Sequence, residues 1–88
     1  PAEVEECICR LPFVSESCVV GKVVGGKQYL KAYVTLREPV DTRTAADRII
    51  KWCGDNLIRY SVPTFVDVLD AMPRTKLAKI DYKELENR

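Results

Sequence analysis

The sequence predicts an α+β domain in which helices pack on a small antiparallel or mixed sheet. Apolar residues recur every three or four positions in two segments, which indicates amphipathic helices. Between these segments, two valine-rich or alternating runs flank Gly25-Gly26, a pair typical of a β-hairpin. A short apolar run after the second helical segment predicts a third strand. With 88 residues, the chain corresponds to a single domain.

The first helix is expected over residues 2–11. Its buried face follows the i, i+3, i+4, i+7 spacing and is formed by Val4, Cys7, Ile8 and Leu11. Glutamates in the first turn favour a helix N-terminus. Pro1 stands where a helix can begin, and Pro12 ends it.

The hairpin is expected from a strand over residues 14–24 and a second strand over 29–37. In the second strand, alternate residues face one side, namely Leu30, Ala32, Val34 and Leu36. The two strands should pair antiparallel, with one face of the pair against a core.

A second helix is expected after the polar connection that contains Pro39, with Thr42 or Thr44 as its N-cap. Its apolar stripe comprises Ala46, Ile49, Ile50, Cys53 and Leu57. Its water-facing residues are Asp47, Arg48, Lys51 and Asp55. Gly54 weakens this helical pattern or ends it early.

The remaining elements are short. Val62 precedes a proline and should be extended, and the third strand should cover residues 64–69. A loop broken by Pro73 follows, over residues 71–77. A terminal helix is expected over residues 81–86, with Asp81 as its cap and Glu84 at the capping-box position.

Composition excludes several classes of function. The net charge is only +1, which argues against a general nucleic-acid binder. The absence of histidine removes Ser-His, Cys-His and His-metal chemistry. No apolar run approaches the ~20 residues that cross a bilayer, and no signal peptide is visible, so a cytoplasmic location is expected.

The four cysteines favour a reduced protein without a metal site. Cys7, Cys18 and Cys53 occupy positions where the pattern requires small apolar side chains, so we expect them to be buried thiols. The even count leaves disulfides in a secreted protein as the alternative. The Cys7-x-Cys9 spacing is not the usual zinc spacing, and no second pair follows it.

The most informative candidate residue is Lys79. It follows Pro73 by six positions and precedes the terminal helix, so its ammonium is held on a loop with ordered ends. Gly25-Gly26 lies between two strands and is therefore not a phosphate-binding loop. We interpret the chain as an incomplete functional unit, in which Lys79 acts on an anion bound outside this domain.

Short segments along nearly the whole chain resemble one family when they are taken in order. These segments are Pro1-Ala2-Glu3-Val4-Glu5 with Leu11-Pro12-x-Val14, Val19-Val20-Gly21, Lys31-Ala32-Tyr33-Val34, Tyr60-Ser61-Val62-Pro63, and Met72-Pro73-Arg74-Thr75 with Lys79-Ile80 and Leu85. Together they resemble the C-terminal domain of adenylate-forming enzymes, which include acyl-CoA synthetases, adenylation domains of peptide synthetases and firefly luciferases. The resemblance implies that residues 1–88 are the C-terminal lid domain and that the large N-terminal domain is absent.

The resemblance also implies a role in an ATP-dependent, AMP-forming ligase. The N-terminal adenylation domain of the same enzyme would bind ATP, Mg²⁺ and the carboxylic acid substrate, and Lys79 would be the catalytic lysine of adenylation. Rotation of the lid would then admit a thiol, from CoA or from the phosphopantetheine of a carrier protein. A lysine acyltransferase is an implied partner acting on Lys79. The isolated domain should be inactive; the alternative is a non-catalytic docking module.

Several positions near Lys79 depart from the family pattern or support the loop. Pro73 and Thr75 should shape the loop. Ala78 stands where the family has glycine, so it is strained if the position needs a positive φ and harmless if it needs only a small side chain. Tyr82 stands where the family often has arginine.

The remaining charged candidates and Trp52 each have two interpretations. Lys22 stands where the family commonly has an acidic residue. Each of Lys22, Lys27 and Arg59 is either a contact for CoA phosphates or a solvated surface charge. Arg74 is either solvated or an interdomain ion-pair partner. Trp52 packs against the absent large domain or lies at the edge of the core.

Overall fold

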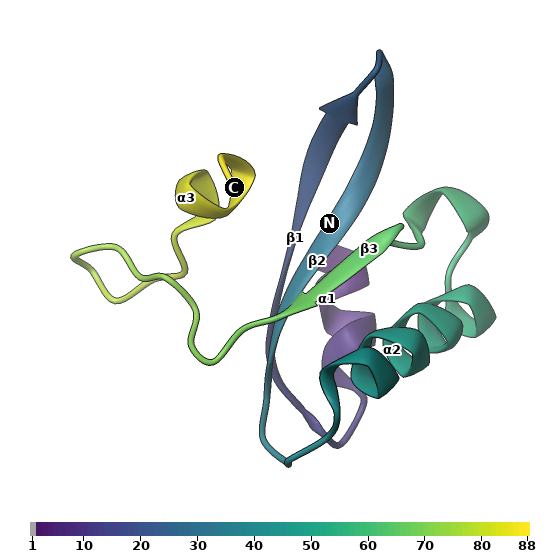
Figure 1. The fold of residues 1–88 in the computed structure, drawn as a ribbon, viewed down its shortest axis with the longest axis horizontal. Coiled ribbons are helices and arrows are strands. Elements are labelled where there is room, and N and C mark those ends of the chain that lie inside the picture. The colour runs from purple at the N-terminus through teal and green to yellow at the C-terminus, as the bar shows by residue number, and fades with distance from the viewer. Residues whose placement is uncertain (1) are drawn as a thin grey trace.

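The computed structural model describes residues 2–88, apart from the side chain of Tyr60, and confirms an α+β architecture. The elements in chain order are α1 (Ala2–Cys9), β1 (Val14–Val24), β2 (Lys27–Leu36), α2 (Thr42–Asn56), the 3₁₀ turn η1 (Arg59–Ser61), β3 (Phe65–Val68) and α3 (Tyr82–Glu86). In Figure 1, α1 and α2 lie on one face of the sheet. The helix α3 lies on the opposite face, near β1, at the end of a long segment. The role expected for Pro1 lies outside the described residues.

The sheet is mixed, with β2 in the centre. β1 pairs with β2 antiparallel, and β3 pairs with β2 parallel. The predicted hairpin is confirmed: Gly25 and Gly26 have φ values of 58° and 77°, which a two-residue type I′ loop requires. The second strand begins at Lys27, earlier than predicted, because the polar residues at the hairpin tip still pair across the turn.

The first core lies between the sheet and the two larger helices. It includes Val4, Ile8, Val14, Val19, Ala32, Val34, Ala45, Ile49 and Cys53. The predicted apolar stripe of α2 is partly wrong, because Ala45 is fully buried while Ala46 and Ile50 are only half-buried. The stripe is centred on the Ala45–Ile49–Cys53 row, since one i, i+4 row meets the sheet most directly.

The helix ends differ from the predictions in three places. Asp41, not Thr42 or Thr44, caps α2: its carboxylate accepts from the backbone N–H of Thr44 at 3.1 Å. Gly54 does not end the helix, which continues to Asn56. α1 ends at Cys9, two residues early, because the N–H of Leu11 bonds the carbonyl of Ile8 and tightens the chain into a turn.

The expectation of a sheet with one buried face is wrong. The opposite face of β1 and β2 carries a second core, formed by Cys18, Val20, Tyr33, Met72 and Leu85. Met72 and Leu85 come from the segment after β3, which folds back across the sheet. We call residues 69–88 the C-terminal arm. The sequence does not predict that the arm is buried, because the apolar residues of the arm follow almost no helix or strand spacing.

The buried thiols are confirmed. Cys7, Cys18 and Cys53 are buried and free, and Cys9 is exposed. Burial raises the pKa of the Cys53 thiol to about 12 and that of the Cys18 thiol to about 11. Trp52 lies at the edge of the core, where its indole N–H donates to the carbonyl of Cys7 at 2.7 Å. Within residues 2–88 no helix is long and apolar enough to cross a membrane.

Candidate functional site

The loop that carries Lys79 is a short, hydrogen-bonded hairpin, which we call the lysine loop (residues 73–81). Arg74 and Ile80 form an antiparallel bridge at its base. The N–H of Thr75 donates to the carbonyl of Lys79 at 2.8 Å, and the N–H of Asp81 donates to the carbonyl of Pro73 at 2.8 Å. The chain on both sides of Lys79 is therefore fixed by backbone bonds.

The tip of the lysine loop is a tight turn built on Thr75. The N–H of Ala78 donates to the carbonyl of Thr75 at 3.0 Å, and the N–H of Leu77 donates to the Thr75 hydroxyl at 3.3 Å. A hairpin loop of this length usually has a type I turn followed by a residue in the left-handed region. Ala78 is that residue, with a φ of 63°.

The left-handed backbone decides between the two interpretations of Ala78. The position requires a positive φ, so alanine is strained there and glycine is the residue that fits without strain. For an L-residue the left-handed region costs roughly 1–2 kcal/mol. The hydrogen bonds on either side hold Ala78 in this conformation.

We expect Ala78→Gly to raise the free energy of unfolding. Relief of the left-handed strain, roughly 1–2 kcal/mol, exceeds the extra entropy of an unfolded glycine, roughly 0.5–1 kcal/mol. The net gain should be about 0.5–1 kcal/mol, measured by urea unfolding of the 88-residue chain. Lys76→Gly is the matched control, because Lys76 is in the same turn without a positive φ; it should lower stability. A loss of stability in Ala78→Gly would contradict the strain.

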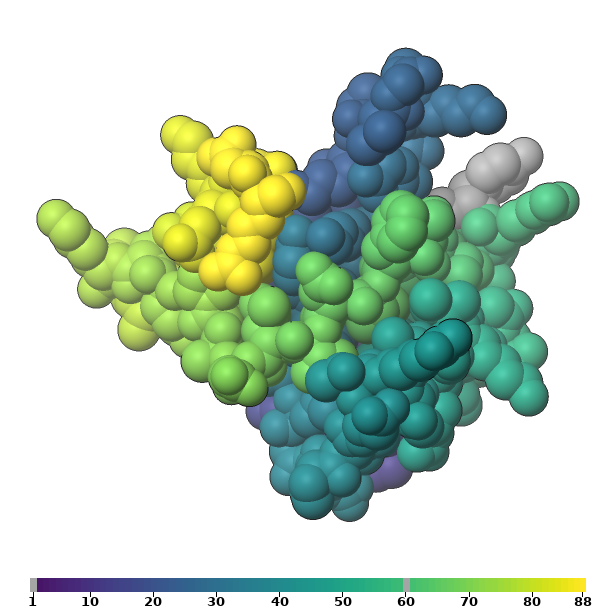
Figure 2. Space-filling model, viewed as in Figure 1, coloured from purple at the N-terminus to yellow at the C-terminus, as the bar shows by residue number. Residues whose placement is uncertain are grey.

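The Lys79 side chain is exposed at the end of this ordered loop. Within residues 2–88, leaving aside the Tyr60 side chain, its ammonium makes neither a hydrogen bond nor an ion pair. Leu77, at the tip, is 79% exposed. Figure 2 shows the yellow-green lysine loop projecting from the left of the molecule. The loop therefore presents a cation and an apolar side chain to whatever lies outside the domain.

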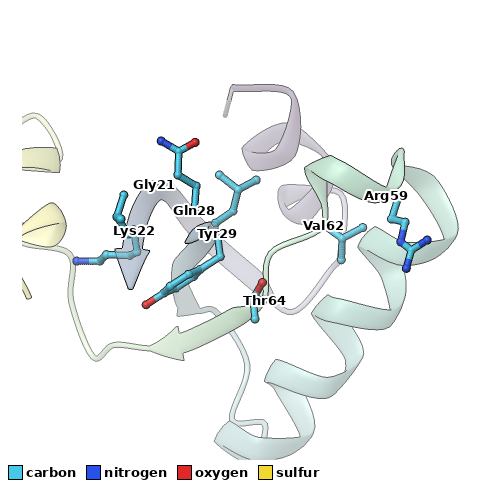
Figure 3. A pocket seen from close by; sticks show the side chains of 9 residues that line it. Gly21, Lys22, Gln28, Tyr29, Arg59, Val62 and Thr64 are labelled. Atoms are coloured by element: carbon cyan, nitrogen blue, oxygen red, sulfur yellow. The ribbon is translucent and has the colours of Figure 1, made fainter. Parts of the chain in front are cut away.

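A groove of about 550 Å³ lies between the hairpin and the link to β3. Figure 3 shows its lining, which includes Tyr29, Val62 and Thr64 and has Lys22 and Arg59 at opposite ends. Val62 is extended, as predicted. Lys27 is exposed on the hairpin and does not line the groove. The structure thus brings Lys22 and Arg59 to one groove, and it separates both from the lysine loop.

Lys22 is engaged within the domain. Its ammonium donates to the backbone carbonyls of Leu85, Glu86 and Arg88 at 3.0, 2.6 and 2.9 Å. Leu85 and Glu86 are the last two residues of α3, where a cation is favourable, and Arg88 lies two residues beyond the helix. In Figure 3 the Lys22 side chain points toward this yellow helix and away from Arg59. Lys22 therefore stabilises the arm in this conformation.

Tyr82 joins the arm to the first helix. Its hydroxyl donates to the carboxylate of Glu5 at 3.0 and 3.1 Å, and that carboxylate also accepts from the N–H of Val19 at 2.7 Å. Burial and the Glu5 carboxylate raise the pKa of the Tyr82 hydroxyl, which favours the protonated form that donates this bond. Asp81 caps α3 as predicted, through a 3.1 Å bond from the N–H of Glu84. Sequence reasoning missed the Tyr82–Glu5 pair because the two residues are 77 positions apart.

Comparisons with known proteins show which family this chain resembles. A family described as the AMP-binding enzyme C-terminal domain matches residues 3–79. A linear gramicidin synthase from Brevibacillus parabrevis is 38% identical over 84 residues, which is 94% of this chain and 1% of that protein. Indoleacetate–CoA ligase from Aromatoleum aromaticum is 31% identical over 92 residues, which is 100% of this chain and 18% of that protein.

Solved structures show the same likeness. The benzoate CoA ligase from Burkholderia xenovorans LB400 superposes with a TM-score of 0.89 and 30% identity, covering 98% of this chain and 18% of that one. The chain spans less than a fifth of the length of each of these relatives. Because the family match covers most of the chain, this protein belongs to the family of AMP-binding enzyme C-terminal domains.

Proposed function

We propose that this chain is the mobile C-terminal domain of an ATP-dependent, AMP-forming acyl-CoA ligase, and that Lys79 supplies a positive charge for carboxylate adenylation. Membership of the family and the ligases among its relatives support the enzyme class. The observation that carries the role of Lys79 is its exposed ammonium, held on an ordered loop without a partner among the described residues.

In the first half-reaction, an oxygen of the substrate carboxylate attacks the α-phosphorus of ATP. A new P–O bond forms, the bond to the β-phosphate oxygen breaks, and pyrophosphate leaves. Two anions meet in this step, so charge on the phosphoryl oxygens must be stabilised. A lysine has a compact charge on a long stem, which suits it to reach across a domain interface. Lys79 would do so from this chain.

ATP, Mg²⁺ and the carboxylic acid would be held by the N-terminal domain. Among residues 2–88, no three or more His, Cys, Asp or Glu side chains form a group that could hold a metal ion. The groove near Arg59 and the lysine loop are both open surfaces rather than an enclosed nucleotide pocket. This chain's own part in adenylation is therefore the charge of Lys79 and the placement of the loop that bears it.

In the second half-reaction, the domain would rotate and present another face. The thiol of CoA or of a carrier-bound phosphopantetheine attacks the acyl carbonyl, the thioester bond forms and AMP leaves. Arg59 at the groove and Lys27 on the hairpin are the candidate contacts for CoA phosphates. Lys22 would join them only by exchanging its bonds to the end of α3. Rigid-body rotation would let one active site run both steps.

ATP–pyrophosphate exchange in the intact parent enzyme tests the proposal. With a panel of carboxylic acids, exchange should depend on one acid class, and addition of the thiol acceptor should release AMP and form a thioester. A folded full-length protein without exchange for any acid would instead support the non-catalytic docking module.

The same exposure makes Lys79 a candidate target for a lysine acyltransferase. Acylation would remove the charge of Lys79 and so stop adenylation. A ligase that uses ATP and CoA would work in the cytoplasm, where both are supplied.

A further inference from the structure

Alternate residues of β1 contact the C-terminal arm at several points. Because side chains alternate between the faces of a strand, Glu16, Cys18, Val20 and Lys22 lie on one face. Cys18 and Val20 pack in the second core against residues of the arm. Glu16 and Lys22, at either end of this row, make polar contacts with the arm. The row thus contacts the arm through apolar side chains in its middle and charged side chains at its two ends.

The position of Glu16 depends on an irregularity in β1. The pairing with β2 shifts between Val14 and Glu16, so the strand contains one extra residue there. This shift lets Val14 face the first core while Glu16 faces the arm. Glu16 is only partly exposed, with a side-chain exposure of 35%.

Arg74 links this carboxylate to the tip of the lysine loop. Its Nη2 contacts Oε2 of Glu16 at 2.5 Å, and its Nη1 donates to the carbonyl of Ala78 at 3.3 Å. Ala78 is the strained residue that directly precedes Lys79. One guanidinium thus joins the sheet to the peptide that bears Lys79, in a fork geometry that an arginine supplies and a lysine does not.

The other polar anchors of the arm lie farther along the chain. Tyr82 bonds Glu5, and Lys22 bonds the end of α3, so both fix the helix that follows the lysine loop. Arg74 is the anchor on the loop itself, and it joins residues 58 positions apart. At the base of the loop Ile80 is partly buried against the second core, whereas residues 75–79 are exposed. The placement of this exposed part relative to the sheet therefore depends on the contact made by Arg74.

We propose that Arg74, held by Glu16, is a positioning residue that sets where Lys79 is presented when the domain docks. This inference rests on the proposed function of Lys79. Catalysis depends on geometry at the scale of an ångström, and a misplacement of about 1 Å costs on the order of 10²-fold. Arg74 acts through the backbone at Ala78, whereas Lys79 acts on the substrate.

The test uses the intact parent enzyme and separates the two half-reactions. Arg74→Gln and Glu16→Gln should each lower kcat for ATP–pyrophosphate exchange by on the order of 10-fold, with KM for ATP unchanged. The double variant should be no worse than Arg74→Gln alone, because the residues act as one unit. Thioester formation from supplied acyl-adenylate should be unaffected. Arg74→Lys, which keeps the ion pair with Glu16, should recover part of the loss.

Glu16→Gln is the decisive variant because it leaves the charge of Arg74 in place. If exchange falls in Arg74→Gln but not in Glu16→Gln, Arg74 acts directly on the substrate and the inference is wrong. Unchanged exchange in both variants, a change in KM alone, or equal loss of both half-reactions would also overturn it. Asp67→Asn is the matched control: it removes an ion pair with Lys31, 3.1 Å long, that does not touch the loop, and it should change neither step.

Amide hydrogen exchange separates this inference from the proposed function. In Arg74→Gln, the Ala78 and Thr75 amides, whose bonds close the loop, should exchange faster than in the Asp67→Asn control. If Lys79→Ala leaves pyrophosphate exchange intact, the proposed role of Lys79 in adenylation falls, whatever these amides do. If Lys79→Ala stops the reaction but the amides and kcat of Arg74→Gln match the parent, only the role of Arg74 falls.

Discussion

Replacing Lys79 with alanine in the intact parent enzyme should lower acyl-adenylate formation by on the order of 10²–10³-fold, since that is the usual cost of one lost electrostatic contact to a transition state. The Lys79 ammonium has no partner among the described residues, so its removal should not disturb the domain itself. The measurement is ATP–pyrophosphate exchange at saturating ATP and acid. The loss should appear in kcat, because the charge matters most when pyrophosphate is leaving.

Thioester formation from supplied acyl-adenylate should survive the same substitution. In the proposed rotation, the lysine loop leaves the active site before the thiol attacks, so Lys79 has no part in that step. Lys76→Ala and Lys83→Ala are matched controls, because both lysines are exposed and flank Lys79 on the arm. Each should retain most of the exchange activity. Equal loss of both half-reactions in Lys79→Ala, or similar losses in the controls, would contradict an adenylation-specific role.

Elements with local signals can be predicted from the sequence. The apolar spacing in α1 and the Gly25-Gly26 pair describe contacts between residues close in the chain, and both predictions are confirmed. The capping of α3 by Asp81 is likewise a local bond, and its prediction is confirmed. The cap of α2 is harder to assign because Asp41, Thr42 and Thr44 all fit a cap, and only the backbone geometry decides between neighbouring candidates.

Features that depend on distant residues cannot be predicted in this way. The second core buries Tyr33, which the alternation of β2 places on the side opposite the main core, because the arm returns to cover it. The sequence suggests a solvated or interdomain charge at Arg74, whereas the residue pairs with Glu16 within the domain. The φ of Ala78 follows from bonds made by Thr75, so the identity of residue 78 alone does not reveal the strain.

The candidate site depends on a different kind of signal. Lys79 stands out from its place after Pro73 and from the family resemblance, and the family match supports that resemblance. The catalytic role of Lys79 stays a prediction, as do the CoA contacts of Lys27 and Arg59. The proposed site is shared between two domains, so these residues are best tested in the parent enzyme.

Leu85→Ala should cause the largest loss of stability that we predict. Leu85 is fully buried in the second core, and truncation of a buried leucine costs about 2–5 kcal/mol. The control is Leu77→Ala, which removes the same atoms from a side chain that is 79% exposed and should change stability by less than about 0.5 kcal/mol. Urea unfolding measures both.

The loss in Leu85→Ala should appear first in the arm. α3 spans only Tyr82–Glu86, too short to persist without packing, so its docking depends on Leu85. The α3 amides should therefore lose protection at lower urea than the transition reported by Trp52, whose indole is held by α1 and the first core. If the arm detaches on its own, the loss of unfolding free energy caused by Leu85→Ala cannot exceed the free energy with which the arm docks on the rest of the domain.

Coincident transitions of the α3 amides and Trp52 would mean instead that both cores unfold as one unit. If the arm detaches first, the lysine loop loses its support, and adenylation should fall although Lys79 itself is intact.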